Sequence, residues 1–272
     1  MIKTDAASSA PWWVVTDLDG TLMDHCYNWR PALEAIRCLQ AQRIPVIPCT
    51  SKTAEEVRSF RAAAGLRDPF IVENGGAVHG ETSTGDPWEL SLGRPVTELR
   101  PILMELEQLL DEPLQAIDAL SAKQASVLLG LQGQELQMAC SRSWSLPFVP
   151  PSASARQRLP ELASRYGVSV VQGNRMSHLL GAKASKGRAL EALKLREGGS
   201  SVRVLALGDS PNDQPLLEAG DISVVVPGPD GPHPVFAQAL AEGRYELAPA
   251  PHAHGWAEVI FQTVLSGGAS FL

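Results

Sequence analysis

Short apolar runs alternate with amphipathic segments in the N-terminal part of the chain. The runs 12–15, 44–49 and 69–72 are apolar and rich in β-prone residues, which is typical of strands buried on both faces of a sheet. Between them, residues 30–43 and 53–65 carry apolar side chains at helical spacing. An order of strand, helix, strand, helix, strand predicts a parallel sheet, because parallel neighbours need a crossover between them.

The pattern changes near Gly80. Residues 81–87 are polar and predict a loop, and the pair Gly173-Asn174 between two short apolar runs is typical of a β-hairpin turn. The elements expected in this middle segment are helices over 99–110, 122–129, 134–142 and 156–166 and strands over 168–172 and 176–180. This mixture predicts an inserted α+β domain over residues 81–182.

Helix and strand alternate again from Lys186 to the C-terminus. The elements expected there are helices over 186–196, 211–219, 233–242 and 255–265 and strands over 202–207, 222–226 and 245–248. The whole pattern predicts an α/β fold, a Rossmann-like three-layer core with a parallel sheet. Residues 12–80 and 183–272 would form this core, and residues 1–11 a flexible N-terminal leader.

Composition and charge argue against several classes of protein. The chain has 272 residues, 44% of them hydrophobic, and no apolar run approaches the ~18 residues of a membrane span. A net charge of −7 and the lack of a basic stripe argue against a nucleic-acid surface. Four cysteines without paired or metal-type spacing indicate free thiols in a reducing compartment, so a cytoplasmic protein is expected.

Two carboxylates, Asp17 and Asp19, follow the first predicted strand. Ligands of an open α/β sheet bind outside the carboxyl ends of its strands, so both acids would face a ligand site. A capped turn is the alternative, because Asp often accepts hydrogen bonds from its own turn. A calcium loop is excluded, because Leu22 and Asn28 stand where such a loop needs Gly and Glu. The motif alone does not decide between a functional pair and a cap.

Two further positions suit a phosphate group. Thr50, Ser51 and Lys52 follow the second strand and precede a helix, whose free N–H groups and positive dipole end attract anions. Lys186 opens another helix, where its charge opposes the dipole, so a functional reason for it gains weight. An ordinary helix cap and a solvated surface lysine remain the structural alternatives.

Asp209 and Asp213 flank a predicted helix start directly after the strand over 202–207. Either acid alone could cap that helix. Facing Asp17 and Asp19 across the sheet edge, however, they would repel strongly unless a cation lies between them. Mg²⁺ is the natural candidate, because it takes oxygen ligands and commonly bridges carboxylates to phosphate.

These motifs resemble those of the haloacid dehalogenase-like hydrolase superfamily, in the same order along the chain. They are Asp17-Leu18-Asp19-Gly20-Thr21, Thr50-Ser51-Lys52, Lys186-Gly187 and Gly208-Asp209-Ser210-Pro211-Asn212-Asp213. The segment Glu73-Asn74-Gly75-Gly76-Ala77, which leads into the insertion, is similar to that of the Cof-like branch. In that branch an α+β cap domain covers the core, so the insertion over 81–182 is expected to be such a cap.

Within that branch the chain resembles the mannosyl-3-phosphoglycerate phosphatases from Trp12 onward. The similar segments are 16–25, 49–53, 69–77, 141–148 and 173–181. Two positions differ from the cap motifs of that family, because Leu146 stands in place of an acid and Met176 in place of an aromatic residue. Both lie in the segment expected to choose the sugar, so a glucosyl-3-phosphoglycerate phosphatase fits about as well.

The resemblance implies a Mg²⁺-dependent phosphatase that forms an aspartyl-phosphate. Asp17 would be the nucleophile, and Asp19 the general acid and then the general base. The implied Mg²⁺ ligands are Asp17, the backbone carbonyl of Asp19, Asp209 and Asp213. The implied phosphate ligands are Thr50, Ser51 and Lys186. The partner would be a small phosphorylated sugar-glycerate, and neither nucleic acid nor membrane is expected.

For the organic part of the substrate, the resemblance implies Arg142 as partner of the glycerate carboxylate, since a guanidinium suits a planar anion. The other implied substrate contacts are Lys52, Asn74, Arg175, His178 and Asn212. His178 is equally well explained as a hairpin residue with a structural hydrogen bond. Two other functions stay open: a different sugar-phosphate phosphatase or phosphomutase on the same scaffold, and a non-catalytic protein that binds a phosphorylated metabolite.

Overall fold

A parallel sheet lies at the centre of the protein, in a computed structural model that describes residues 10–173, 175–198 and 201–265. Five strands follow the order β11-β10-β9-β1-β2, and every neighbouring pair is parallel. They are β1 (Trp12–Thr16), β2 (Val46–Pro48), β9 (Arg203–Gly208), β10 (Ile222–Val225) and β11 (Glu246–Leu247). The predicted α/β fold with a parallel sheet is confirmed.

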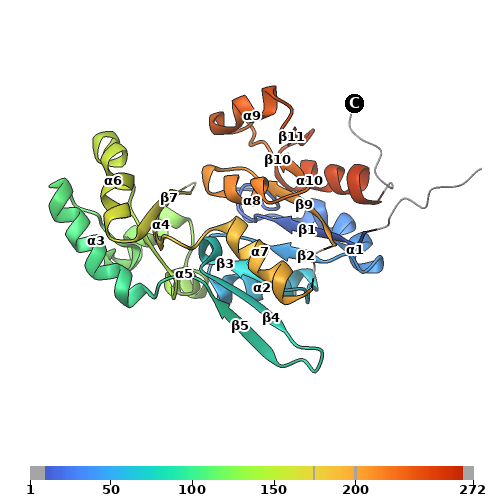
Figure 1. The fold of residues 1–272 in the computed structure, drawn as a ribbon, viewed down its shortest axis with the longest axis horizontal. Coiled ribbons are helices and arrows are strands. Elements are labelled where there is room, and N and C mark those ends of the chain that lie inside the picture. The colour runs from blue at the N-terminus through green and yellow to red at the C-terminus, as the bar shows by residue number, and fades with distance from the viewer. Residues whose placement is uncertain (1–9, 174, 199–200, 266–272) are drawn as a thin grey trace, which may run out of the picture.

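Helices cover both faces of this sheet and give the core three layers (Figure 1). Alternate residues of β1 point to opposite faces, so Val14 joins one buried apolar cluster while Trp13 and Val15 join the other. The first cluster is covered by α1 (Leu33–Ala41), α2 (Ala54–Ala64) and α10 (His252–Ile260). The second is covered by α7 (Lys186–Arg196), α8 (Gln214–Glu218) and α9 (Ala237–Ala241).

The third predicted strand, β3 (Phe70–Val72), begins a second sheet. It touches the chain just after β2 through one parallel bridge between Cys49 and Ile71, and then pairs antiparallel with β4 (Ala77–Glu81). The strand β5 (Pro87–Ser91) completes this sheet as a hairpin that projects from the core (Figure 1). The loop predicted over 81–87 is confirmed for residues 82–86, while its end residues, Glu81 and Pro87, form the last pair of β4 and β5.

A third, antiparallel sheet lies at the other end of the molecule with its own helices (Figure 1). Its strands, in spatial order, are β6 (Ser145–Phe148), β8 (Ser177–Gly181) and β7 (Val168–Gln172). The helices are α3 (Val96–Leu110), α4 (Ala122–Leu129), α5 (Gly133–Cys140) and α6 (Ala153–Arg165). A separate apolar cluster, which includes Leu106, Phe148 and Leu179, holds these elements together. We call this part of the molecule the cap.

Two details of the cap differ from the prediction or lie outside it. No strand was expected around Pro147, but β6 contains this residue, because β6 is an edge strand, where a residue without an N–H is tolerated. The hairpin of β7 and β8 is as predicted, although Asn174 of its turn lies outside the described residues, as do residues 1–9 of the predicted leader. The exact domain boundaries stay predictions.

Helix ends follow the local sequence signals. Thr53 and Glu56 form the predicted capping box of α2, with Glu56 N–H donating to Thr53 Oγ1 and Thr53 N–H to Glu56 Oε2, and Gly65 ends the helix at φ +69°. The structure also contains short helical segments besides the α-helices. They are the 3₁₀ segments Arg30–Ala32, Glu73–Gly75, Ile117–Ala119, Pro211–Asp213 and Pro234–Phe236 and the π-helical segment Phe261–Leu265. Within the described ranges, no helix is long and apolar enough to cross a bilayer.

Candidate active site

The carboxyl ends of the central strands open into a cleft between the core and the cap. Eight of the predicted site residues line this cleft: Asp17, Asp19, Ser51, Lys52, Arg142, Arg175, His178 and Asn212. The other five, Thr50, Asn74, Lys186, Asp209 and Asp213, are not in the lining but adjoin residues that are, as described below. The structure thus brings together all the strand ends that the sequence singled out.

Lys186 lies at the centre of the buried part of this site. Its Nζ contacts Asp17 Oδ1 at 2.6 Å and Asp213 Oδ1 at 2.5 Å, and all three side chains are almost fully buried. Burial alone would lower the pKa of Lys186, but the charges of Asp17 and Asp213 outweigh it and raise that pKa. Burial raises the pKa of Asp17 to about 7, with Lys186 opposing the shift and Asp213 adding to it. Lys186 is therefore a fixed cation beside the predicted nucleophile.

Three carboxylates form a group with the chemistry of a divalent-cation site. Asp17, Asp209 and Asp213 each place an oxygen within 4.8 Å of the others. Thr21 Oγ1 donates to Asp209 Oδ1 at 2.8 Å, and the amides of Asp209 and Ser210 donate to Asp213 Oδ2 at 3.0 Å. These donors fix the carboxylates, whose oxygens are the ligand type that Mg²⁺ prefers, so the residues fit this ion.

The turn formed by Asp19 and Gly20 packs closely against this acidic group. Gly20 adopts φ +92°, and a Cβ atom on it would lie 2.4 Å from Asp209 Oδ2, so only glycine fits. The C-terminal helix α10 supports the same turn, because His252 Nδ1 donates to Gly20 O at 2.8 Å. Trp256 Nε1 donates to Thr16 Oγ1 at 3.0 Å, immediately before Asp17. No local sequence signal indicated this role for α10.

The carboxylate of Asp19 stands apart from that acidic group. Its Oδ2 pairs with Lys52 Nζ at 2.9 Å, and Lys52 also reaches Glu56 at 3.4 Å. Burial alone would lower the pKa of Lys52, but the charges of Asp19 and Glu56 outweigh it and raise that pKa. Lys52 is thus charged and next to the predicted general acid, while Thr50 Oγ1 lies behind it and accepts from its amide at 3.3 Å.

Asn74 and Asn212 form a buried amide pair at the edge of the cleft. Asn212 Nδ2 donates to Asn74 Oδ1 at 2.9 Å, and the Asn74 amide donates to Thr50 O at 3.0 Å. Asn212 lines the cleft and Asn74 does not. Asn74 therefore lies behind the cleft and connects the Thr50 loop to Asn212, and the predicted substrate contact of Asn74 stays a prediction.

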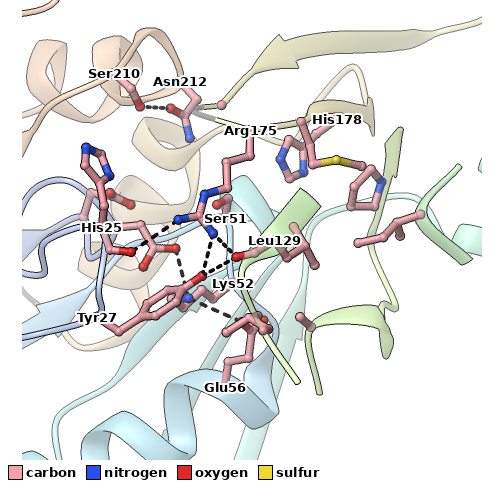
Figure 2. Close-up of a pocket in the computed structure, with 18 of the residues that line it drawn as sticks. His25, Tyr27, Ser51, Lys52, Glu56, Leu129, Arg175, His178, Ser210 and Asn212 are labelled. Carbon is pink, nitrogen blue, oxygen red and sulfur yellow. Dashed lines mark hydrogen bonds and ion pairs between the residues drawn. The ribbon is translucent and has the colours of Figure 1, made fainter. Parts of the chain in front are cut away.

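The predicted cap residues reach the core in different ways. Arg142 Nη1 donates to Ser51 O at 2.6 Å, which brings a guanidinium next to residues 50–52, the segment predicted to bind phosphate. We call this segment the phosphate loop. Arg175 Nη1 donates to Tyr27 Oη at 3.1 Å and also to Leu129 O (Figure 2). His178 is buried, and burial, followed by the charges of Arg142 and Lys186, lowers its pKa to about 3, so its imidazole is neutral.

Tyr27 is a site residue that the sequence did not reveal. Its φ of +60° is rare for an aromatic residue, and the loop is closed by Asp24, whose Oδ1 accepts from the Cys26 and Asn28 amides. The Tyr27 ring has Lys52 Nζ 4.5 Å from its centroid, and Figure 2 shows its hydroxyl facing the cap. Asp24 and Asn28 were visible as turn formers, but the direction of the Tyr27 side chain depends on tertiary contacts.

Comparison with known proteins agrees with these motifs. The family model described as sucrose-6F-phosphate phosphohydrolase matches residues 10–260. Two similar proteins are named glucosyl-3-phosphoglycerate/mannosyl-3-phosphoglycerate phosphatase. The one from Persephonella marina is 28% identical over 92% of this chain and 96% of its own length. The one from Methanococcoides burtonii is 33% identical over 80% of this chain and 85% of its own.

Solved structures show the same fold. A haloacid dehalogenase-like hydrolase from Bacteroides thetaiotaomicron has a TM-score of 0.66 at 17% identity, covering 92% of this chain and 98% of its own. The sucrose-phosphatase of a Synechocystis species, solved with sucrose and phosphate, has a TM-score of 0.61 at 17% identity, covering 92% and 97%. The predicted resemblance and the phosphoric monoester hydrolase class are confirmed. The chain belongs to the sucrose-6F-phosphate phosphohydrolase family of haloacid dehalogenase-like phosphatases.

Proposed function

We propose that this phosphatase hydrolyses glucosyl- or mannosyl-3-phosphoglycerate to the glycosylglycerate and phosphate, using Mg²⁺ and an aspartyl-phosphate on Asp17. One observation carries the proposal: Asp17, which is paired with the buried Lys186, lines a cleft whose cap side presents Arg142. A phosphate ester that also carries a carboxylate matches these two cations, with its phosphate near Lys186 and its carboxylate at Arg142. The names of the two relatives support the same substrates.

In the first half of the reaction, an Asp17 carboxylate oxygen attacks phosphorus and the bond from phosphorus to the sugar-glycerate oxygen breaks. The carboxyl proton of Asp19 goes to that leaving oxygen. In the second half, Asp19 takes a proton from water, the water oxygen attacks phosphorus, and the bond from phosphorus to the Asp17 oxygen breaks. Phosphate leaves, and both Asp17 and Asp19 return to their starting states.

Positive charge must balance the phosphoryl oxygens during both halves. Lys186 supplies a fixed charge beside Asp17, and the Ser51 and Thr50 loop would hold the remaining oxygens. The residues that would hold Mg²⁺ are Asp17, the backbone carbonyl of Asp19, Asp209 and Asp213. When bound, the ion would supply charge stabilisation at the transferring phosphoryl group.

On the organic side, Arg142 would bind the glycerate carboxylate, since its guanidinium lies next to the Ser51 carbonyl at the mouth of the phosphate loop. Arg175, held by Tyr27, and the neutral imidazole of His178 would contact the sugar hydroxyls. Asn212 would contact the substrate directly, with Asn74 behind it.

A substrate panel tests the proposal. Phosphate release is measured with glucosyl- and mannosyl-3-phosphoglycerate, sucrose-6F-phosphate, a mannose phosphate and p-nitrophenyl phosphate. We expect the highest kcat/KM for a glycosyl-3-phosphoglycerate, since only this class uses both the Lys186 and the Arg142 ends of the cleft. A rate on both such compounds no higher than on p-nitrophenyl phosphate would overturn the proposal. Preference for sucrose-6F-phosphate would instead favour a sucrose-phosphate phosphatase, the activity that the description of the family model names.

Removing the metal should stop turnover. With excess EDTA we expect phosphate release to fall by at least about 100-fold, because loss of several kcal/mol of charge stabilisation corresponds to such a factor. Adding Mg²⁺ in excess of the chelator should restore the rate. Undiminished release after EDTA treatment and buffer exchange would show that the acidic group of Asp17, Asp209 and Asp213 acts without a metal.

Replacing Arg142 should separate the two ends of the cleft. In Arg142→Ala we expect KM for the glycosyl-3-phosphoglycerate to rise about 10- to 100-fold, because a hydrogen bond to a charged group contributes about 1.5–3 kcal/mol. Activity on p-nitrophenyl phosphate should change little. Arg158→Ala is the matched control, since Arg158 is an exposed cap arginine that donates to Leu109 O. Equal losses on both substrates would show that Arg142 does not bind the substrate carboxylate.

A further inference from the structure

The carboxylate of Glu73 joins the core to the cap through four hydrogen bonds. Ser143 N donates to Oε1 at 3.0 Å, and Trp144 N and Ser145 N donate to Oε2 at 3.0 and 2.8 Å. Ser145 Oγ donates to the same oxygen at 2.7 Å. Glu73 is 2% exposed, and within the described residues no ion pair links it to a cation. The hydrogen bonds to this carboxylate therefore come from one short stretch of the cap, residues 143–145.

The core side of this connection has a strained backbone. Glu73, Asn74 and Gly75 have φ values of +50°, +58° and +88°, a left-handed run that non-glycine residues rarely adopt. A Cβ on Gly75 would lie 2.2 Å from Ser185 O, so this turn packs directly against the start of α7 and Lys186. The direction of the Glu73 carboxylate is thus fixed by the elements that hold the phosphoryl site.

The cap side of the connection leads to Arg142. Ser145, which binds Glu73 through both its amide and its hydroxyl, also contacts Arg142 Nη1 through Oγ at 3.3 Å. Arg142 Nη1 in turn donates to Ser51 O. Glu73, Ser145, Arg142 and Ser51 form a continuous chain of contacts from the strained turn to the phosphate loop.

We infer that Glu73 is a positioning residue that sets where Arg142 stands relative to the phosphoryl site, and so selects phosphate esters with a carboxylate at the matching distance. The inference rests on the proposed function, since it assigns Arg142 to the substrate carboxylate. Glu73 itself touches no substrate, because it does not line the cleft. If Glu73 only stabilised the cap, its substitution would instead reduce activity on all substrates to the same extent.

Glu73→Gln is the first test, because the amide keeps the shape but turns one acceptor into a donor facing donors. We expect kcat/KM for the glycosyl-3-phosphoglycerate to fall about 10- to 100-fold, mainly through KM, and that for p-nitrophenyl phosphate to change less than about 3-fold. Adding Arg142→Ala to this variant should cost little more, since both substitutions disturb one contact chain. Equal losses on both substrates, or fully additive effects, would overturn the inference.

Glu112→Gln is the matched control. Like Glu73, the Glu112 carboxylate accepts from a cap amide and hydroxyl, those of Ser152, and does not line the cleft, but this contact lies within the cap and does not join it to the core. This variant should leave both kcat/KM values within about 3-fold of wild type, as expected for a polar change away from the site. A loss of selectivity as large as that of Glu73→Gln would show that removing any carboxylate contact of the cap has this effect, and would overturn the inference.

Hydrogen exchange gives a readout that needs no substrate. Glu73→Gln should speed exchange of the Ser143, Trp144 and Ser145 amides while the β8 amides stay protected. Unchanged exchange at 143–145 would overturn the inference. If wild type cleaves neither glycosyl-3-phosphoglycerate, the proposed function fails, and exchange still decides whether Glu73 holds this segment. Should Glu73→Gln not fold, Ser145→Ala removes the hydroxyl between Glu73 and Arg142 and must show the same substrate split on a smaller scale.

Discussion

Replacing Asp17 with asparagine should reduce phosphate release by about 10⁴-fold or more, because loss of a covalent nucleophile removes the whole two-step route. The substitution keeps the shape of the side chain and can still accept a hydrogen bond from Lys186. The expected loss is therefore one of kcat on every substrate, including p-nitrophenyl phosphate. Initial rates with a sensitive phosphate assay measure it.

Asp221→Asn is the matched control for this result. Its carboxylate accepts from Val204 N at 2.7 Å, next to β9 but away from the cleft lining. We expect that variant to retain activity within a few-fold and to lose at most a modest amount of stability. An Asp17→Asn enzyme with a rate near wild type would show that another group attacks phosphorus.

Replacing Lys186 with methionine should damage both stability and rate. Removal of one partner from a buried ion pair costs about 3–5 kcal/mol, because the remaining charges are left without compensation, here Asp17 and Asp213. The loss of a fixed cation at the phosphoryl group should lower kcat about 10²- to 10³-fold on all substrates. Urea unfolding and steady-state kinetics measure the two effects separately.

Lys194→Met separates this result from the cost of any lysine in α7. Lys194 is partly exposed and pairs with Glu191 at 3.1 Å, a contact that should contribute at most about 1 kcal/mol. Added Mg²⁺ should recover part of the stability of Lys186→Met, since an ion that binds only the folded acidic group stabilises it. Equal unfolding free energies for the two variants would contradict the central place of Lys186.

The sequence was sufficient to predict that most residues of the candidate site lie close together. Apolar strands followed by polar residues place Asp17, Thr50 and Asp209 at one sheet edge, because parallel strands share a direction. The helix start at Lys186 and the capping box at Thr53 could also be predicted, because each has a signal in the local sequence. These parts needed no knowledge of which distant segments meet.

Residues whose role depends on long-range contacts could not be predicted. Tyr27 is directed by a left-handed backbone that its residue type disfavours, and His252 reaches Gly20 from the far end of the chain. Glu73 was part of a recognisable motif, yet its partners lie about seventy positions later in the cap. Spacing along the sequence carries no signal for such contacts.

The secondary structure of the insertion was predicted less well than that of the core. Within it, β6 was missed because Pro147 is a residue that strands usually exclude, and β5 because it is a largely exposed edge strand without a continuous apolar run. The strand β4, which joins the predicted core to the insertion, is buried but too short in apolar residues to be recognised. The proposed sugar preference would depend on this same region, where Leu146 and Met176 differ from the motifs of the mannosyl-3-phosphoglycerate phosphatases. A buried Leu146 and Met176 offer no polar group to a sugar hydroxyl.

The covalent intermediate is the most direct test of the account. Wild-type enzyme is mixed with a glycosyl-3-phosphoglycerate, quenched in acid within milliseconds to seconds, and digested for mass spectrometry. We predict that the peptide containing Asp17 gains the mass of a phosphoryl group during turnover, and that Asp19→Asn prolongs this state because water is no longer activated. Rapid phosphate release with an unmodified Asp17 peptide at every time point would contradict the account.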